Sequence, residues 1–215
     1  MTKIKLCGLR RAEDIEAALL LKPDYIGFVF YKKSKRFISP EEARILKSLL
    51  DTGAGALSTG DADCIKAVGV FVNEDPKAVA NLLENGMIDL AQLHGDEDEE
   101  YIKNLRKYTD RPVIKAFKIK TREDLLKAEI SSADMILLDA GMGDGVSFDW
   151  EMLKNFNRPY FLAGGMTPEN VTAAIEKLHP YGVDVSSGIE TDGVKDVVKM
   201  KAFMLNARGK EYSLS

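Results

Sequence analysis

Residues that could form a disulfide framework, a metal site or a membrane span are scarce in this sequence. Its 215 residues include two cysteines, Cys7 and Cys64, and two histidines, His94 and His179. Two cysteines are too few for a disulfide scaffold, and two separated histidines do not predict a metal site. No apolar run approaches the roughly 20 residues needed to cross a bilayer, and the N-terminus MTKIKLCGLRR lacks the apolar core of a secretion signal. We therefore expect a protein of the reducing cytoplasm.

An excess of charge of either sign is also missing. The 30 basic and 34 acidic residues give a net charge of −4 and are interspersed along the chain. The sequence therefore provides no basic face for nucleic acid and no polybasic segment for a membrane surface. Hydrophobic residues make up 45% of the chain and aromatic ones 8%, which is typical of one globular domain with a sizeable core. A small anionic ligand would have to be bound by local positive groups.

Short β-branched or aromatic runs alternate along the chain with longer segments of helical periodicity. We predict eight strands, which begin near Lys3, Tyr25, Ala67, Leu90, Val113, Met135, Tyr160 and Val183. Six of the seven intervals between these starts are 22 to 25 residues, and the remaining one is 42. Because each strand is followed by a helix at a near-constant period, the pattern predicts parallel strands with right-handed crossovers. Eight such units favour a single-domain (β/α)8 TIM barrel over residues 1–215, with an open doubly wound sheet as the alternative.

The one long interval contains a segment without helical or strand character. Residues 51–64, DTGAGALSTGDADC, are rich in Gly, Ala, Ser, Thr and Asp and follow a helix predicted from Pro40 to Leu50. We interpret them as a surface insertion on the face opposite the carboxyl ends of the strands, where Cys64 has no chemical role. A capping residue followed by a proline at the first helical position predicts helix starts at Ser39-Pro40, Asp75-Pro76 and Thr167-Pro168.

Two strand ends late in the chain have the composition of anion-binding turns. In GVDVSSGIE an apolar run stops at a Ser-Ser-Gly turn before a helical pattern, and in FLAGGMTPEN two glycines follow a strand. Glycine permits close backbone approach, serine supplies hydroxyl donors, and free N–H groups at a helix start carry positive partial charge. In an eight-stranded barrel the loops after the seventh and eighth strands often form a phosphate site. The predicted phosphate ligands are Gly164, Gly165, Ser186, Ser187 and Gly188.

Reactive side chains stand at the ends of the first and sixth strands. Cys7 ends KIKLC before Gly8, where backbone N–H groups would favour its thiolate; taken alone, it is more simply explained as a buried, unreactive cysteine. Asp139 ends MILLD before a Gly-rich loop, with glycines at 141, 143 and 145, that could close over a ligand. Burial of that carboxyl would favour its protonated form, which a general acid needs near neutral pH.

Further polar residues follow the second, fourth and eighth strands. From the basic cluster in YKKSKRF we expect Arg36 to turn inward and grip a carboxylate, although the whole cluster could be a solvated loop. Gln92 and His94 lie on one side of a strand by its two-residue period, and they are equally well explained as a hydrogen-bonded core pair or as substrate contacts. Asp184 should point into the barrel, where it could bind a ligand or neutralise a buried lysine. Asp149 is predicted to cap the next helix.

Seven motifs in order resemble one enzyme family over nearly the whole chain. They are KLCG, GFVFYKKSKRFISP, VGVFVNE, QLHG, LLDA with a Gly-rich loop and SFDW, LAGGMTPENV and VDVSSGIE. Each motif alone is weak, but together, at barrel spacing, they are similar to phosphoribosylanthranilate isomerase of tryptophan biosynthesis. The chain departs from the family pattern in the 51–64 insertion, in KLCG where KICG is usual, and near Val146, where the family commonly has a lysine.

The resemblance implies an Amadori rearrangement of N-(5′-phosphoribosyl)anthranilate, an aldosylamine, to the corresponding 1-amino-1-deoxyketose phosphate. By the family's pattern, Asp139 protonates the ribose ring oxygen and Cys7 removes the proton from C2, with no metal or organic cofactor. The phosphate would lie on the two turns named above, and Arg36 would pair with the anthranilate carboxylate. Gln92, His94 and Asp184 would contact the middle of this small phosphosugar substrate. Both a monomer and a homodimer are compatible with the resemblance.

Two other functions fit parts of the pattern. A different phosphosugar isomerase or epimerase on the same barrel would use two aspartates or a bound metal. The first needs an aspartate in place of Cys7, and the second needs clustered histidines. A phosphosugar-binding protein without turnover would keep the phosphate turns and lose the reactive pair. The presence of both Cys7 and Asp139 favours an enzyme.

Overall fold

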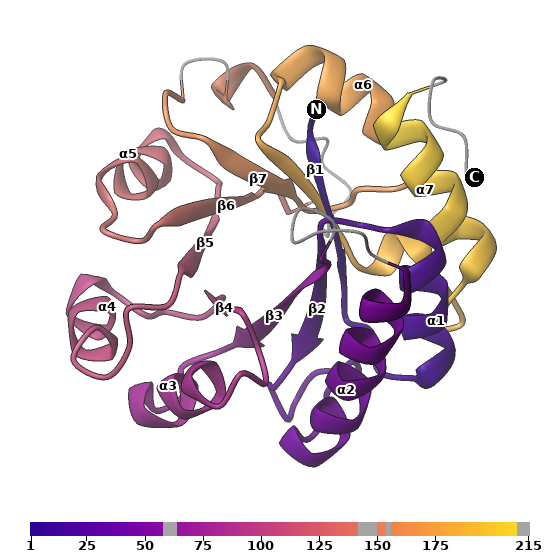
Figure 1. The fold of residues 1–215 in the computed structure, drawn as a ribbon. Helices are drawn as coiled ribbons and strands as arrows, with labels where there is room; N and C mark the ends of the chain where they lie inside the picture. The colour runs from indigo at the N-terminus through magenta and orange to yellow at the C-terminus, as the bar shows by residue number, and fades with distance from the viewer. Residues whose placement is uncertain (58–63, 142–149, 154–155, 210–215) are drawn as a thin grey trace.

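Eight parallel strands form a closed barrel in the order of the chain (Figure 1). The structure is a computed structural model that describes residues 1–57, 64–141, 150–153 and 156–209. The strands of the barrel are β1 (Lys3–Cys7), β2 (Tyr25–Val29), β3 (Lys66–Phe71), β4 (Leu90–Leu93), β5 (Val113–Lys118), β6 (Met135–Asp139), β7 (Tyr160–Ala163) and β8 (Gly182–Val185). Each begins within one residue of its predicted start, and the predicted (β/α)8 barrel is confirmed.

The barrel closes where β1 pairs with β8. In this register Ile4 lies opposite Val183 and Lys5 lies opposite Asp184, while the other edge of β1 pairs with β2. Every barrel strand therefore has two hydrogen-bonded neighbours, which excludes the open doubly wound sheet considered above. Because all eight strands are parallel, their carboxyl ends meet at one rim of the barrel.

A ring of helices surrounds the barrel (Figure 1). The α-helices are α1 (Ala12–Leu21), α2 (Pro40–Leu57), α3 (Pro76–Glu84), α4 (Glu99–Leu105), α5 (Arg122–Ile130), α6 (Val171–Leu178) and α7 (Val197–Arg208). The 3-10 helices are η3 (Trp150–Leu153) and η4 (Ser187–Ile189), and an antiparallel hairpin of β9 (Glu190–Thr191) and β10 (Val194–Lys195) lies between η4 and α7. Within the described ranges, no helix is both long and apolar enough to cross a membrane.

Apolar side chains cover both faces of the barrel strands. The cluster inside the barrel contains Tyr25, Val68, Leu90, Ile114, Leu137 and Phe161. The larger cluster between strands and helices includes Ile26, Phe28, Ile136, Leu138 and Leu162. Because both faces are covered, the strands read in the sequence as near-continuous apolar runs rather than as alternating ones. The polar residues among them therefore mark positions with another role.

Helix α2 is longer than predicted. It continues to Leu57 instead of ending at Leu50, so the first residues of the predicted 51–64 surface loop are helical. Lys47 pairs with Asp51 one turn further on, and Gly53 packs so closely against Leu19 of α1 that a side chain there would collide. This packing of α2 on α1 outweighs the poor helix propensity of glycine. Residues 58–63 of the predicted loop lie outside the described residues.

The segments after β7 and β8 also differ from the prediction. Helix α6 begins at Val171 rather than directly after Thr167-Pro168, because Asn170 accepts a hydrogen bond from the Thr167 N–H and forms a turn first. After β8 the chain forms η4 and the β9–β10 hairpin, where the sequence predicts a helix directly.

The other two predicted helix starts are confirmed. At the start of α2, Ser39 and Glu42 each accept a hydrogen bond from the backbone N–H of the other. At the start of α3, the Asp75 side chain accepts a hydrogen bond from the Lys77 N–H, and Pro76 is the first helical residue. These caps set the direction in which each chain leaves the rim.

Three aspartates tie even-numbered strands to the strands before them. Each immediately precedes its strand and accepts a hydrogen bond from a backbone N–H near the start of the previous strand. The distances are 2.9 Å for Asp24 with Ile4, 2.7 Å for Asp89 with Ala67 and 2.7 Å for Asp134 with Val113. These contacts lie at the amino ends of the strands, a face that contributes to stability rather than to ligand binding in such barrels.

Asp89→Ala should lower the free energy of unfolding by about 1–3 kcal/mol, because the N–H of fully buried Ala67 loses its acceptor. Urea denaturation measures the change. Asp51→Ala is the matched control, since it removes the exposed partner of Lys47 on α2 and should alter stability by less than about 0.5 kcal/mol. Equal stability of the two variants would contradict this role of Asp89.

Candidate active site

A cavity of about 320 Å³ opens at the carboxyl ends of the barrel strands. Ten of the eleven site residues predicted from the sequence line it: Cys7, Arg36, Gln92, His94, Asp139, Gly164, Gly165, Asp184, Ser186 and Ser187. The eleventh, Gly188, packs against the neighbouring turn. Residues from the beginning, middle and end of the chain therefore meet in one cavity.

A second cavity of about 510 Å³ lies beside the first and shares His94 with it. Its lining contains four consecutive acidic residues, Asp96 to Glu99. The second cavity also contains three lysines, one of which pairs with Glu97, so charge alone does not separate the two cavities. Only the first cavity is lined by the turns after β7 and β8. We therefore assign the predicted phosphate-binding site to the first cavity.

Cys7 is the last residue of β1 and packs against Val29 and Val70 in the cavity wall. Only 7% of the residue is exposed. Burial raises the pKa of the Cys7 thiol, and the ammonium groups of Lys5 and Lys195 offset only part of this effect. The expectation that the barrel mouth favours the thiolate is therefore wrong, because the apolar wall removes the sulfur from water.

Asp139 ends β6 on the same rim. Its Oδ1 accepts a hydrogen bond from the Gly141 N–H at 3.1 Å, and its Oδ2 lies 3.4 Å from Nε2 of His94. Burial by itself would raise the pKa of Asp139, but the contacts with His94 and Gly141 together lower it below its usual value. The predicted shift toward the protonated form is wrong, because these donors stabilise the carboxylate more than burial destabilises it.

Gln92 and His94 extend this contact into a chain of three polar groups. Gln92 Nε2 lies 2.8 Å from Nδ1 of His94, and the other ring nitrogen faces Asp139. With the amide as donor, Nδ1 accepts and the ring proton lies on Nε2, toward the carboxylate. Gln92 is buried, and its Oε1 has no hydrogen-bond partner among the described residues. The hydrogen-bonded pair is confirmed, and because both side chains line the cavity, a contact with a substrate stays a prediction.

The turn after β7 depends on glycine. Gly164 and Gly165 have φ angles of 90° and 63°, in the left-handed region that favours glycine. A Cβ at Gly164 would lie 2.6 Å from Oδ1 of Asp139 and 2.5 Å from the Gly141 nitrogen. The turn after β7 therefore packs against the Asp139 carboxylate and also lines the cavity.

The turn after β8 lies directly against the turn after β7. A Cβ at Gly188 would collide with the Met166 carbonyl, so only glycine allows this approach. Ser186 donates a hydrogen bond from Oγ to the Cys7 carbonyl at 3.1 Å, which ties the turn to the end of β1. The short η4 helix begins at this turn.

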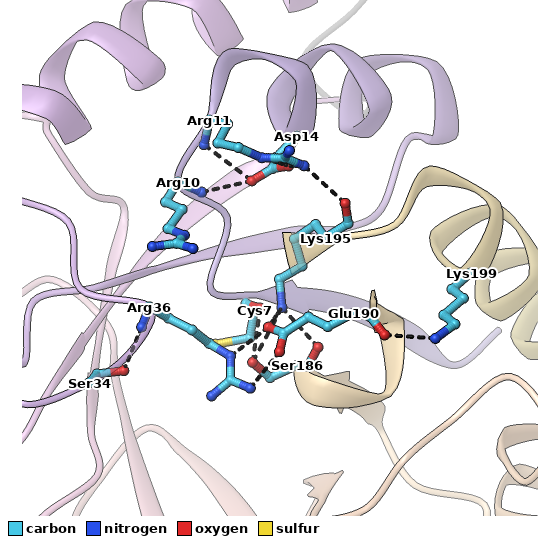
Figure 2. A network of polar contacts seen from close by, with 10 residues as sticks. All are labelled: Cys7, Arg10, Arg11, Asp14, Ser34, Arg36, Ser186, Glu190, Lys195 and Lys199. Atoms are coloured by element: carbon cyan, nitrogen blue, oxygen red, sulfur yellow. Dashed lines mark hydrogen bonds and ion pairs between the residues drawn. The ribbon is translucent and has the colours of Figure 1, made fainter. Parts of the chain in front are cut away.

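Arg36 reaches the cavity but is paired within the protein, beside Cys7 (Figure 2). Its Nε and Nη2 donate to Glu190 at 2.6 and 2.8 Å, and Lys195 Nζ contacts the same carboxylate at 2.7 Å. Burial would raise the pKa of Glu190, but the two cations lower it below its usual value. Lys195 also donates to the Ser186 carbonyl at 2.8 Å. Nη1 of Arg36 takes no part in the pair and is the nitrogen that would meet a ligand carboxylate.

Asp184 points into the barrel, where Lys5 Nζ donates to its Oδ1 at 2.9 Å. Lys5 is completely buried, and 7% of Asp184 is exposed. Of the two roles left open for Asp184, neutralising a buried lysine is confirmed. Because Asp184 also lines the cavity, a contact with a ligand stays a prediction.

Predictions about the loop after β6 fall mostly on residues 142–149, outside the described residues. Asp149 and two of the three glycines of the proposed lid belong to this range. Gly141, which precedes it, has a φ angle of 42°. In the described part of the chain, no three His, Cys, Asp or Glu side chains gather as metal ligands.

Comparison with known families decides what kind of site this is. The model of the family described as N-(5′phosphoribosyl)anthranilate (PRA) isomerase matches residues 4–206. The chain belongs to this isomerase family. The resemblance that the seven motifs indicated is therefore confirmed.

Individual members of the isomerase family are similar over their full length. N-(5′-phosphoribosyl)anthranilate isomerase of Thermoanaerobacter sp. (strain X514) is 46% identical over 216 residues, which cover 97% of this chain and 99% of the relative. The crystal structure of phosphoribosyl anthranilate isomerase from Thermotoga maritima has a TM-score of 0.82 at 36% identity, covering 97% of this chain and 99% of that one. A further crystal structure of such an isomerase, in complex with reduced 1-(o-carboxyphenylamino)-1-deoxyribulose 5-phosphate, has a TM-score of 0.80 at 35% identity and the same coverage.

Three charged residues that contact the cavity lining were not predicted from the sequence: Lys5, Glu190 and Lys195. Lys5 carried a usable signal, because it lies two residues before Cys7 in the same strand and therefore on the same side. Glu190 stands at the end of the VDVSSGIE motif but looked like part of a helix start. Lys195 carried no signal, since only the β9–β10 hairpin returns it to the rim.

His94→Phe should raise the pKa of Asp139, because the variant keeps a ring but removes the N–H that faces the carboxylate. A carbon NMR titration of labelled aspartate, assigned by comparison with Asp139→Asn, measures the shift. Since the folded-state pKa of Asp139 is lowered, this contact stabilises the fold above the unfolded-state pKa and is lost as pH falls through the folded-state value. The acid-dependent loss of stability should therefore be smaller in His94→Phe. An Asp139 pKa identical in both proteins would rule out this role of His94.

Proposed function

We propose that this chain converts N-(5′-phosphoribosyl)anthranilate to 1-(2-carboxyphenylamino)-1-deoxyribulose 5-phosphate, the Amadori rearrangement of tryptophan biosynthesis, with Asp139 as general acid and Cys7 as general base. The observation that carries the proposal is the presence of both groups in one cavity with two glycine-serine turns on its wall. Family membership supports the same reaction. So does the related crystal structure, which holds a reduced form of this product.

The proposed reaction needs one proton donor and one proton acceptor. Asp139 gives a proton to the ribose ring oxygen, the C1–O bond breaks with its electrons on that oxygen, and a C1=N iminium forms. Cys7 then takes the proton from C2, and the electron pair of the C2–H bond forms C1=C2 of a neutral enolamine. Tautomerisation gives the C2 ketone and a CH2 group at C1. Since C2 is oxidised while C1 is reduced, the rearrangement balances without a redox partner.

The protonation states that the reaction needs are opposite to those that the surroundings of Asp139 and Cys7 favour. Reaction requires a proton on Asp139 and a thiolate at Cys7, whereas the lowered pKa of Asp139 and the raised pKa of Cys7 favour the reverse. Both states hold the same number of protons, so the reactive state needs no net uptake or release of protons. A bound anionic substrate adds negative charge and excludes water, and both effects raise the pKa of Asp139 toward the range a general acid needs. The same effects raise the pKa of Cys7, which the nearby cations Lys5 and Lys195 oppose.

Separate parts of the cavity would hold the two ends of the substrate. The phosphate would lie on backbone N–H groups and hydroxyls of Gly164, Gly165, Ser186, Ser187 and Gly188. Nη1 of Arg36 would pair with the anthranilate carboxylate at the other end. Gln92 Oε1, buried and without a partner among the described residues, would accept a hydrogen bond from a ribose hydroxyl. His94 and Asp184 would contact the middle of the sugar.

The remaining expectations are part of the same proposal. The chain would act as one domain, in the cytoplasm, on a small-molecule phosphosugar and without a metal or organic cofactor. Its two unpaired thiols, Cys7 and Cys64, support this setting.

Cys7→Ala and Asp139→Asn should each lower kcat by roughly 10²-fold or more while a product analogue still binds, because each removes one partner of the proton transfer. The fluorescence change of the anthranilate substrate measures turnover, and the same assay separates an enzyme from a binding protein without turnover. Cys64→Ala is the control and should have normal kinetics, since Cys64 is exposed and lies just before the amino end of β3, opposite the rim that holds the cavity. Near-normal rates in both Cys7→Ala and Asp139→Asn would refute the assignment.

Arg36→Met should raise KM by roughly tenfold or more and change kcat less, because a charge-assisted hydrogen bond to the substrate carboxylate is lost. Lys33→Met, at an exposed position of the same basic cluster, is the matched control and should leave KM unchanged. Steady-state kinetics distinguish the two. Equal KM values for Arg36→Met and the unsubstituted enzyme would remove Arg36 from the substrate site.

A further inference from the structure

Lys5 is the most deeply buried charged residue near the proposed base. It is completely buried in β1, and the two-residue period of a strand puts it on the same inward side as Cys7. Its Nζ donates to Oδ1 of Asp184 at 2.9 Å across the β1–β8 pairing. Cys7 and Asp184 line the cavity, whereas Lys5 lies one pleat deeper in the barrel. Lys5 is therefore placed to act on Cys7 without touching a substrate.

Stability of the fold does not account for this ion pair. The next layer of the barrel interior is apolar, with Tyr25, Val68, Leu90, Ile114 and Phe161. Removing two charges from water costs about as much as their attraction returns, so apolar residues at such positions are often equally stable or better. Both charges of the pair also act on the neighbouring Cys7 thiol.

We propose that Lys5 is a positioning residue of this isomerase: its ammonium group, held in place by Asp184, supplies the positive charge that makes Cys7 available as a thiolate. Asp184 in turn limits how strongly that charge acts on the sulfur. The proposal rests on the proposed role of Cys7 as the base. In the proton-transfer step the thiolate becomes a thiol by taking the C2 proton, while Lys5 keeps all its protons and only stabilises the charge that is consumed.

The other charged groups around Cys7 are less suited to this role. Arg36 and Lys195 approach the thiol from the rim, as Figure 2 shows, but both are paired with Glu190. Against the effect of burial, Lys5 is the strongest influence that lowers the pKa of Cys7, Asp184 opposes it, and Lys195 contributes less. Burial lowers the pKa of Lys5 itself, but Asp184 and Cys7 together raise it above its usual value, so Lys5 remains a cation.

The test measures the ionisation of Cys7 in the whole, unliganded enzyme. Alkylation of Cys7 by iodoacetamide is followed against pH by mass spectrometry, in a Cys64→Ser background so that only one thiol reacts. Lys5→Met should raise the apparent pKa of Cys7 and slow its alkylation at neutral pH by about tenfold or more. Asp184→Asn should shift the apparent pKa in the opposite direction and speed alkylation. The double variant, which removes both charges, should lie between the two single ones.

Lys3→Met is the matched control. It makes the same chemical change in the same strand, but Lys3 lies two residues further from Cys7, is partly exposed and pairs with Asp24. Its alkylation profile should equal that of the unsubstituted enzyme. An equal shift in Lys3→Met and Lys5→Met would overturn the proposal, because the effect would then be one of general charge.

Turnover separates a charge effect from a structural one. In Lys5→Met, kcat should fall at neutral pH by about the same factor as alkylation and recover at higher pH, where the thiol ionises without help. A loss of kcat that is the same at every pH, or no shift of the alkylation profile, would overturn the proposal. If Lys5→Met does not fold, Asp184→Asn is the remaining test. An unchanged or raised apparent pKa of Cys7 in Asp184→Asn would refute the proposal. Failure of the proposed function would look different: Cys7→Ala would keep its turnover while the alkylation shifts remained.

Discussion

The site depends on the pairing of the first strand with the last. When β1 closes on β8, Cys7 comes beside the turn that begins at Ser186, and the Ser186 hydroxyl bonds to the Cys7 carbonyl. The same pairing places Lys5 opposite Asp184 within the barrel. In an open sheet, β1 and β8 would lie at opposite edges. Cys7 would then be far from the turn after β8, and Lys5 would be far from Asp184. A parallel barrel thus joins groups that are almost the whole chain apart, because its carboxyl ends share one rim.

Burial and neighbouring charges have opposite effects on the pKa values of Cys7, Asp139 and Glu190. The apolar wall raises the pKa of Cys7, and the ammonium groups of Lys5 in the same strand and Lys195 in the β9–β10 hairpin partly offset this effect. At Asp139 and Glu190 the balance is reversed, since their hydrogen-bond donors outweigh burial and lower the pKa. Charges therefore occur in compensated groups: Lys5 with Asp184, Arg36 and Lys195 with Glu190, and Asp139 with His94. A ligand that binds here changes these balances before any bond is broken, because it excludes water and adds charge.

Local patterns in the chain were sufficient for the architecture and for most of the cavity lining. Strand starts follow from apolar runs at a near-constant period, and their ends follow from residues such as Gly8 that break a strand. Since parallel strands in a barrel must end at one rim, knowing which residue ends each strand is enough to predict that Cys7 and Asp139 share a cavity. Gly164 and Gly188 were predicted from the composition of their turns: Gly164 has a positive φ angle, whereas Gly188 is required by the close approach of the Met166 carbonyl.

Those local patterns could not predict contacts between distant segments of the chain. Glycines and alanines after Leu50 predict a loop, but packing on α1 keeps the segment helical to Leu57. Arg36 meets Glu190 only because the hairpin after η4 returns to the rim. The directions of the pKa shifts at Cys7 and Asp139 reversed the expectation from composition alone. Each depends on a sum of burial and neighbouring charges, and that sum exists only once strands from the whole chain surround the group.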